Sequence, residues 1–195
     1  ELLSTVQNCN TVLMVERNNR VRPQTDDKQL LGWNALMNTA FSKAYAATGN
    51  KNYLIRAQKN IAHLFECFKD ANGDGWLHTY KNGQAKTPAF LDDYANLIHA
   101  YMQLQEITGE SDYLFKAKKW MEYVLENFID EEGLYFYYTA AYQQDVIIRK
   151  KENYDGATAS GNALICSSLY YLGTVFDHSK WVLHAERMMA SMRKS

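Results

Sequence analysis

The chain has 195 residues, of which 47% are hydrophobic and 22% are charged, and its formal net charge at pH 7 is −1. This length suits one domain or a piece of a larger one, and the composition is that of an ordinary globular protein. A near-neutral chain lacks the basic surface that nucleic acid or an anionic membrane attracts, and no apolar run reaches the roughly 18 residues of a membrane span. We therefore predict neither nucleic-acid nor membrane partners.

The apolar pattern predicts seven helices along the chain. Segment 1–17 is the first, and we expect it to be the outer member of a preceding hairpin. Three helical pairs follow it, at 27–47 with 51–68, 90–107 with 111–128, and 159–174 with 178–193. Gly49 and Gly109 lie where the first two pairs turn, which suits glycine because a left-handed residue ends a helix at low cost.

Three units of 60 to 68 residues repeat along the sequence. The glycine, tyrosine, leucine and alanine of segment 49–57 recur at 109–117, and the aromatic and alanine positions recur at Trp181 and Ala185. Repeats of this kind predict either a ring of helical hairpins or an open solenoid. Because tetratricopeptide and HEAT repeats run about 34 to 47 residues, the longer unit favours the ring.

The two helices of each pair differ in hydrophobic pattern. Segments 90–107 and 159–174 are apolar on nearly all sides, whereas 51–68, 111–128 and 178–193 carry one apolar stripe opposite a charged face. A helix that is apolar all round is buried all round, and a striped helix has one wet side. We therefore predict an all-α fold, an (α/α) toroid segment of three hairpins plus an N-terminal helix, which is part of a six-hairpin barrel.

We expect residues 1–195 to be part of a single toroid domain. A closed toroid needs more than three hairpins, and the chain starts at Glu1 without an initiator methionine, so we expect about half a ring and a fragment of a longer chain. Large exposed apolar patches are uncommon on monomers. The remainder of the toroid, or a second copy of the chain, is therefore expected at the open seam.

The outer-to-inner connections, at roughly 69–89 and 129–158, are long and should lie together at one end of the ring. Long loops with glycine, aspartate and aromatic residues usually carry function. The first contains Asp70, Asn72 and Asp74 at the spacing that begins a calcium-binding loop, but Lys81 stands where that motif needs a bidentate glutamate. We predict a polar turn there and no metal site.

Acidic residues gather where the inner helices begin. Asp27, next to Asp26, and Asp155 each lie 26 residues before the aromatic of the following outer helix, while Asp92 and Asp93 open the middle inner helix. Aspartate at a helix start is ordinarily a cap or a favourable first-turn charge, and this structural role competes for each residue. The doubled acids exceed what capping requires. Carboxylates converging on one aromatic-lined mouth are typical of glycoside processing.

We therefore take Asp26, Asp27, Asp92, Asp93 and Asp155 as candidate catalytic residues. One acid near 92–93 would protonate the leaving oxygen, and one near 26–27 or 155 would activate water or attack. The candidate substrate-binding residues are arginines that could hold a charge, aromatics that could stack on a sugar, and inner-helix amides for its hydroxyls: Arg20, Arg22, Trp33, Asn34, Tyr94 and Asn162.

The histidines and cysteines provide weaker candidates for catalytic residues. His99, on an inner helix, is expected to be a hydrogen-bonded core residue, and His63 and His184 to be surface residues of outer helices. Cys67 and Cys166 lie in helices without a positioned histidine, which argues against nucleophilic thiol chemistry. With Cys9 they are odd in number and far apart, which favours reduced, buried thiols and a cytoplasmic location. No cofactor motif occurs, and we expect no cofactor.

Three ordered motifs resemble a known family: the 20–34 segment with Trp33-Asn34, the Leu-Asp-Asp-Tyr-Ala run at 91–95, and Asp155-Gly156 leading to Ser-Gly-Asn at 160–162. They look like the YyaL and spermatogenesis-associated protein 20 family over nearly the whole chain. The departures are Ala35, where glycine often follows, and Ala159, where proline is usual.

The family resemblance implies a thioredoxin-like domain followed by a six-hairpin toroid, similar to N-acylglucosamine 2-epimerases and six-hairpin glycosidases. This chain would be a toroid segment only. Two main hypotheses follow: a carbohydrate-processing toroid, glycosidase-like or epimerase-like, with a carbohydrate ligand, and a non-catalytic toroid that binds a sugar or a peptide for an attached thioredoxin-like domain. A purely structural scaffold is the third. The segment lacks the inner-helix histidine pair that epimerases use, which weakens the epimerase-like alternative.

Overall fold

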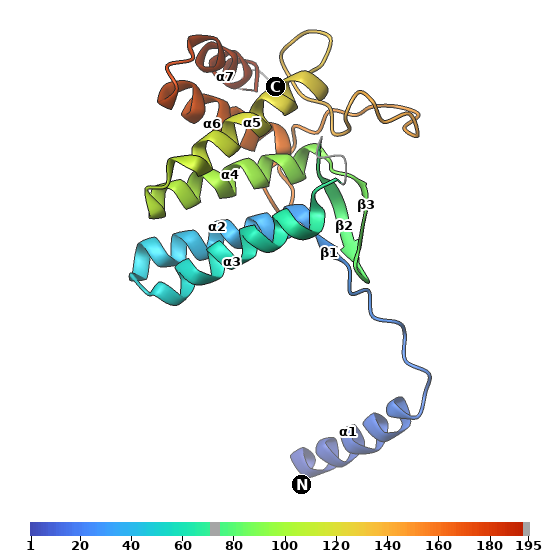
Figure 1. The fold of residues 1–195 in the computed structure, drawn as a ribbon. Coiled ribbons are helices and arrows are strands. Elements are labelled where there is room, and N and C mark those ends of the chain that lie inside the picture. The colour runs from blue at the N-terminus through green and yellow to red at the C-terminus, as the bar shows by residue number, and fades with distance from the viewer. Residues whose placement is uncertain (71–74, 193–195) are drawn as a thin grey trace.

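The computed structural model describes residues 1–70 and 75–192, which form seven helices and a small sheet (Figure 1). The helices are α1 (Leu2–Asn18), α2 (Leu31–Thr48), α3 (Lys51–Phe68), α4 (Leu91–Thr108), α5 (Ser111–Asn127), α6 (Gly161–Val175) and α7 (Ser179–Met192). All seven predicted helices are confirmed, and six have boundaries within two residues of those predicted. The exception is α2, which begins four residues late.

Three short strands account for this late start and were missed by the sequence analysis. The strands β1 (Gln29–Leu30), β2 (Leu77–Lys81) and β3 (Gln84–Pro88) form an antiparallel sheet in that order. Residues before Leu31 are extended because β1 pairs with β2. The β2–β3 turn has positive φ at Asn82 and Gly83, and Asn-Gly is a strong hairpin signal. The fold is therefore an (α/α) arrangement with a small added sheet.

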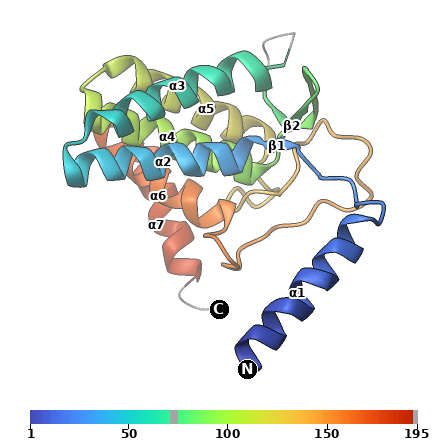
Figure 2. The ribbon, with the colours of Figure 1, turned by 90° about the horizontal axis from the view of Figure 1, so that it is seen from below.

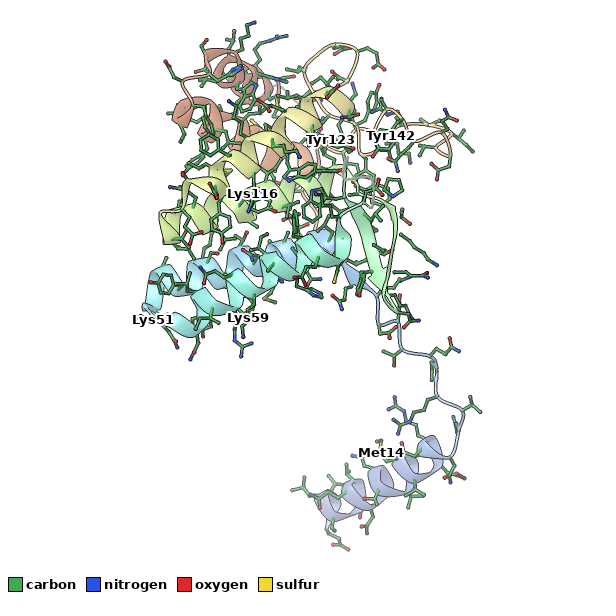
Figure 3. All side chains as sticks on the ribbon, in the orientation of Figure 1. Met14, Lys51, Lys59, Lys116, Tyr123 and Tyr142 are labelled. Atoms are coloured by element: carbon green, nitrogen blue, oxygen red, sulfur yellow. The ribbon has the colours of Figure 1, made fainter. Side chains whose placement is uncertain are left out.

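The inner and outer assignments are confirmed. Helix α4 lies between α2 and α6 (Figure 1). The outer helices α3, α5 and α7 each pack on the inner helix of their own hairpin (Figure 2). Helix α4 buries ten residues and α5 buries four. Lys51 and Lys59 of α3 and Lys116 of α5 project from the outer side (Figure 3). A helix with apolar residues on all of its sides therefore takes the inner position, where every side is covered.

The turns and loops divide between two ends of the hairpin array. The short turns after α2 and α4 end in Gly49 and Gly109, with φ of 66° and 75°, as predicted for left-handed C-caps. The sheet and the long loop between α5 and α6 lie at the opposite end (Figure 1). This places the polar connections of successive hairpins beside one another, as the repeat pattern predicts.

Helix α1 lies apart from the rest of the chain in both ribbon views and has no buried residue (Figures 1 and 2). Several of its apolar side chains are exposed, including Leu2, Leu13 and Met14. Its membership of a preceding hairpin stays a prediction. Within residues 1–70 and 75–192, no helix combines the length and apolar character needed to cross a membrane.

The repeat also extends to how the loops are anchored. Lys69 and Trp76 form an isolated antiparallel β-bridge in the first long loop. Ile129 and Phe136, which lie 60 positions later, form the same kind of β-bridge in the second. The Trp76 backbone N–H donates to the Tyr94 hydroxyl at 3.1 Å, and the Phe136 N–H donates to Asn162 Oδ1 at 2.9 Å. Tyr94 and Asn162 are the repeat-equivalent inner-helix positions. Each therefore fastens a loop onto the following inner helix.

The anchor at Asn162 generates a stability prediction. Its Nδ2 also donates to the Phe136 and Glu152 carbonyls at 2.9 and 3.0 Å, and the residue is fully buried. Asn162→Ala leaves these backbone groups without their partner, so we expect a loss of about 3 kcal/mol in the free energy of unfolding. Asn34→Ala, which removes a single local bond to the Leu30 carbonyl, is the control. Equal losses for the two variants in denaturant titrations would contradict this role.

The open flank of the half-ring generates a second prediction. A cavity of about 580 Å³ between α6 and α7 is lined by Cys166, Tyr170 and Met189, and the latter two are each 47% exposed. We expect the isolated chain to self-associate, because such apolar surface is costly in water. The double variant Tyr170→Lys with Met189→Lys should associate less in sedimentation velocity. The control is the double variant Lys51→Ser with Lys59→Ser, which changes the outer face and should associate as wild type does. A concentrated wild-type monomer would refute the expectation.

Candidate functional site at the mouth of the ring

A small cavity of about 140 Å³ opens at the loop end of the inner helices. We call it the mouth. Residues from α2, β2, α4 and the long loop line it: Gly32, Trp33, Leu36, His78, Asp92, Asp93, Asn96, Tyr138 and Thr158. The structure therefore brings three predicted candidates, Trp33, Asp92 and Asp93, into one site.

Asp93 is the structural centre of the mouth. Its Oδ1 accepts from the Gly32 backbone N–H at 2.8 Å, and its Oδ2 accepts from the Phe90 N–H at 2.9 Å. Oδ2 also lies 2.7 Å from His78 Nδ1. A side chain at the third helical position that reaches back to the N-cap N–H closes the start of α4. Because Asp93 is 2% exposed and both oxygens are engaged, it is poorly placed to attack a substrate.

Asp92 has a different environment although it is the neighbouring residue. It is partly accessible, and burial raises the pKa of its carboxyl to about 6, helped by the negative charges of Glu152 and Asp93. A hydrogen bond from the Gly161 backbone acts in the opposite direction. A Cβ on Gly161 would collide with Asp92 Oδ1, so the glycine allows α6 to approach this close. Asp92 therefore changes protonation near neutral pH.

His78 reaches the mouth from β2. Its hydrogen bond to Asp93 raises the pKa of the imidazole, and partial burial opposes that rise. The ring also packs against Phe90, with centroids 4.8 Å apart. Since Nδ1 is engaged by Asp93, Nε2 is the ring nitrogen left for other partners.

The aromatic walls of the mouth come from separate elements. Trp33 of α2 is 58% exposed. Tyr138 stacks on Phe90 at 4.8 Å, and its carbonyl accepts from the Leu91 N–H at 2.9 Å, which fastens the long loop to the start of α4. Burial, together with Asp92, Asp93 and Glu152, raises the pKa of Tyr138 to about 12. Tyr138 and Trp33 are the aromatic surfaces on which a sugar face can stack.

Asp26 and Asp27 do not lie in the mouth. They precede β1 rather than opening α2, so the prediction of a helix-entry position is wrong for both. Asp27 pairs with Lys81 at the far end of β2, and Asp26 pairs with Lys28 at 3.2 Å. All four side chains are at least 40% exposed. Lys81 is three residues along β2 from His78, which at about 3.3 Å per residue is roughly 10 Å.

Asp155 lies on the loop that leads into α6 and is exposed. Its Oδ1 accepts from the Ser160 N–H at 2.8 Å, and Ser160 in turn caps α6. Thr158, three residues further on, lines the mouth. Asp155 is therefore near the rim, with one oxygen engaged in organising the loop.

Tyr94 and Asn162, which were predicted to contact substrate, anchor loops in this structure. Both are fully buried, because each anchors a loop from inside the fold as described above. Asn34 is half-buried and donates to the Leu30 carbonyl within its own helix start. None of these three residues lines the mouth.

Arg20 and Arg22 lie on the linker after α1 and are not among the residues that line the mouth. Arg22 donates to Asn18 at 2.6 Å, and both arginines line a separate hollow against α1. Among the described residues, those that line the mouth include no arginine or lysine. The linker can be followed from α1 to β1 in Figure 1.

The sequence analysis missed His78, Tyr138 and Glu152. The Asn-Gly turn at 82–83 signalled a hairpin, and strand alternation would then have pointed alternate residues of 77–81 at the helices. His99 was expected to be hydrogen-bonded, but its buried Nδ1 has no partner among the described residues, and burial lowers the pKa of its ring. Asn72 and Asp74, in the loop predicted to be a polar turn without a metal site, lie outside the described residues.

The fold and its mouth define the chain as a segment of an (α/α) toroid. Solved structures agree. A family 76 mannosidase from Bacteroides thetaiotaomicron matches with a TM-score of 0.73 at 17% identity, over 89% of this chain and 46% of that one. Cellobiose 2-epimerase from Spirochaeta thermophila matches with a TM-score of 0.66 at 16% identity, over 88% and 44%.

A third solved match is an α-1,6-mannanase of Salegentibacter in complex with α-1,6-mannotriose. It is an inactive variant in which two consecutive aspartates are asparagines. It matches with a TM-score of 0.67 at 15% identity, over 84% of this chain and 46% of that chain. Likenesses at this level of identity establish the shared fold.

Curated sequences narrow the relationship. Spermatogenesis-associated protein 20 of Mus musculus is 28% identical over 179 residues, and the protein of the same name from Homo sapiens is 27% identical over 184. An uncharacterized protein of Caenorhabditis elegans is 29% identical over 188 residues. These matches confirm the resemblance to the spermatogenesis-associated protein 20 family. No family model matches, and the chain spans about a quarter of the length of these relatives.

The raised pKa of Asp92 yields a pH-dependent prediction. Its folded pKa of about 6 exceeds the ordinary 3.8, so ionisation destabilises the fold: stability falls as pH rises from about 4 to 6 and is then level. Asp92→Asn should remove this fall and raise unfolding free energy above pH 6 by about 1–2 kcal/mol, a value discounted for partial exposure. Asp26→Asn is the exposed control. A variant less stable than wild type at pH 7 would overturn the interpretation.

Proposed function

We propose that the mouth binds a carbohydrate and that Asp92 acts as the general acid in processing a glycosidic bond. The observation that carries this proposal is an accessible aspartate at a helix start whose pKa is raised to about 6. A general acid works best with a pKa near the operating pH, and burial of a carboxyl is a common means of raising it.

Asp92 and Asp93 have different roles in this proposal. The engaged oxygens of Asp93 leave it as a positioning residue that orients His78 and joins α2 to α4. Asp92 retains an accessible surface in the mouth and therefore takes the proton-transfer role. A pair of neighbouring acids whose environments separate their properties is typical of acid–base sites.

The second group of the reaction comes from the long loop. Glu152 lies near enough to Asp92 and Tyr138 to influence the pKa of both. It is exposed, so its carboxylate can contact water. We assign Glu152 the part of activating water or attacking the sugar, with Asp155 as the competing candidate on the same loop.

The comparisons support this assignment by analogy. The matched solved proteins are named as mannosidases, a mannanase and sugar epimerases, and the mannanase is inactive when two consecutive aspartates are replaced. Asp92 and Asp93 are the consecutive pair that lines the mouth of this chain. The activity of the whole protein remains part of the proposal, because the chain covers less than half of each solved toroid named above.

The test measures turnover and binding separately in the longer protein that contains this segment. A panel of α-1,6-mannooligosaccharides and β-linked disaccharides is assayed for reducing-end release and for epimerised product. We expect Asp92→Asn to lower kcat/KM by about a hundredfold or more while ligand binding persists. Wild-type activity should fall as pH rises through about 6, because the protonated form of Asp92 is the donor.

The matched control is Asp26→Asn with Asp27→Asn, which removes an acidic pair outside the mouth and should leave turnover intact. Full activity of Asp92→Asn, or loss of activity only in the control, would contradict the assignment. Saturable sugar binding without turnover by any panel member would favour the non-catalytic binding toroid instead. Epimerised product would favour the epimerase-like alternative.

A further inference from the structure

A second group of reactive side chains lies between α3 and the small sheet, apart from the residues that line the mouth. Cys67 Sγ is 3.5 Å from His63 Nδ1, and both residues lie on α3. His63 Nε2 is 2.9 Å from Gln29 Oε1 of β1. The expectation that Cys67 lacks a positioned histidine is therefore wrong. A spacing of four residues places the two side chains on one helix face, and this was visible in the sequence.

The hydrogen bonds define which ring nitrogen acts as the base. Gln29 Oε1 can only accept, so His63 Nε2 carries the proton and Nδ1 presents its lone pair to the Cys67 thiol. A nucleophile, a base within reach and a third group that orients the base form the arrangement by which proteins activate thiols. Three side chains from two elements supply it here.

Tyr80 of β2 completes the cluster. Its ring meets the His63 ring edge-on, with centroids 6.3 Å apart, and it is the cross-strand partner of Gln29. A hydrogen bond between its hydroxyl and Cys67 raises the pKa of Tyr80. A phenol beside the sulfur is a donor for the negative charge that develops when the thiol proton leaves.

The other two cysteines provide internal comparisons. Cys9 on α1 is exposed, and Cys166 on α6 is buried and donates to the Ala185 carbonyl at 3.4 Å. Burial raises the pKa of the Cys166 thiol, which lowers its reactivity. Cys67 is half-buried and is the cysteine with a histidine base in hydrogen-bond contact.

We propose that Cys67 is a thiol modification site that takes small disulfides, such as glutathione disulfide, and soft alkylating electrophiles. As the Cys67 sulfur attacks one sulfur of the disulfide, the thiol proton passes to His63 Nδ1. The new sulfur–sulfur bond forms while the old one breaks, and the departing thiolate takes the proton from His63 and leaves as a thiol. The small disulfide is the oxidant, so no other co-reactant is needed.

The position of the site gives the modification a structural consequence. His78 and Tyr80 are two residues apart on β2 and therefore point to the same side of the strand, one toward Asp93 and the other toward Cys67. A mixed disulfide adds bulk against the Gln29–Tyr80 pair. The strand that it disturbs is the one that carries His78 into the mouth.

The experiment compares the three cysteines within one folded protein. The protein is incubated at pH 7.5 with glutathione disulfide or, separately, iodoacetamide, quenched over time, and analysed by peptide mass spectrometry for each cysteine. We expect Cys67 to react about tenfold faster than Cys9 despite its lower exposure, since His63 can accept the thiol proton as the sulfur attacks. Cys166 should remain protected, and it therefore reports whether the fold is intact.

His63→Gln should lower the Cys67 rate to that of Cys9 or below, and Gln29→Ala should lower it less, because the histidine loses its orientation but keeps its base. His184→Gln, on α7, is the matched histidine control and should leave the rate unchanged. His63→Asn provides a second variant if His63→Gln exposes Cys166. The proposal is overturned if wild-type Cys67 reacts no faster than Cys9, or if its rate survives loss of His63 while Cys166 stays protected. The carbohydrate proposal is independent of either outcome.

Discussion

The engaged carboxylate of Asp93 is the interaction on which the loop end of this structure depends. One oxygen holds the start of α2 through the Gly32 N–H, and the other closes the first turn of α4 and holds His78 of β2. Three separate elements therefore meet on one buried side chain. Hydrogen bonds to an ionised group are stronger than neutral ones, and leaving such a group unpaired inside the fold is costly. This requirement accounts for the close approach of Gly32.

The same arrangement separates the chemistry of two adjacent acids. Because Asp93 accepts the available donors, Asp92 is left at the accessible wall with the Gly161 backbone as its donor and with negative charge from Glu152 and Asp93 nearby. A helix start normally stabilises a carboxylate, but here burial and like charge outweigh that effect and raise the pKa. The strain of holding a charge at this position is a cost to stability that a proton-transfer role would justify.

The repeat explains why two residues that were predicted to bind substrate support the fold. Tyr94 and Asn162 stand at the same depth in successive inner helices, and the structure shows that this shared depth is where each loop is fastened. Repeat equivalence identified the positions correctly but could not distinguish a buried support from a ligand contact. The His63–Cys67 pair was readable as one helix face, yet its orienting partner Gln29 comes from another element.

The sequence by itself determined the number and nature of the helices, the inner and outer assignment, the glycine caps and the clustering of long loops at one end. Helical periodicity and left-handed turns are local properties of the sequence. In each pair, one helix is apolar on nearly all sides and the other has one charged face, which indicates which of the two is enclosed. Only the tertiary structure decided that Asp26 and Asp27 lie outside the mouth, that His78 and Tyr138 line it, and that burial raises the pKa of Asp92 to about 6. These outcomes depend on strand pairing, loop anchoring and the sharing of hydrogen-bond donors between elements far apart in sequence, which no local pattern encodes.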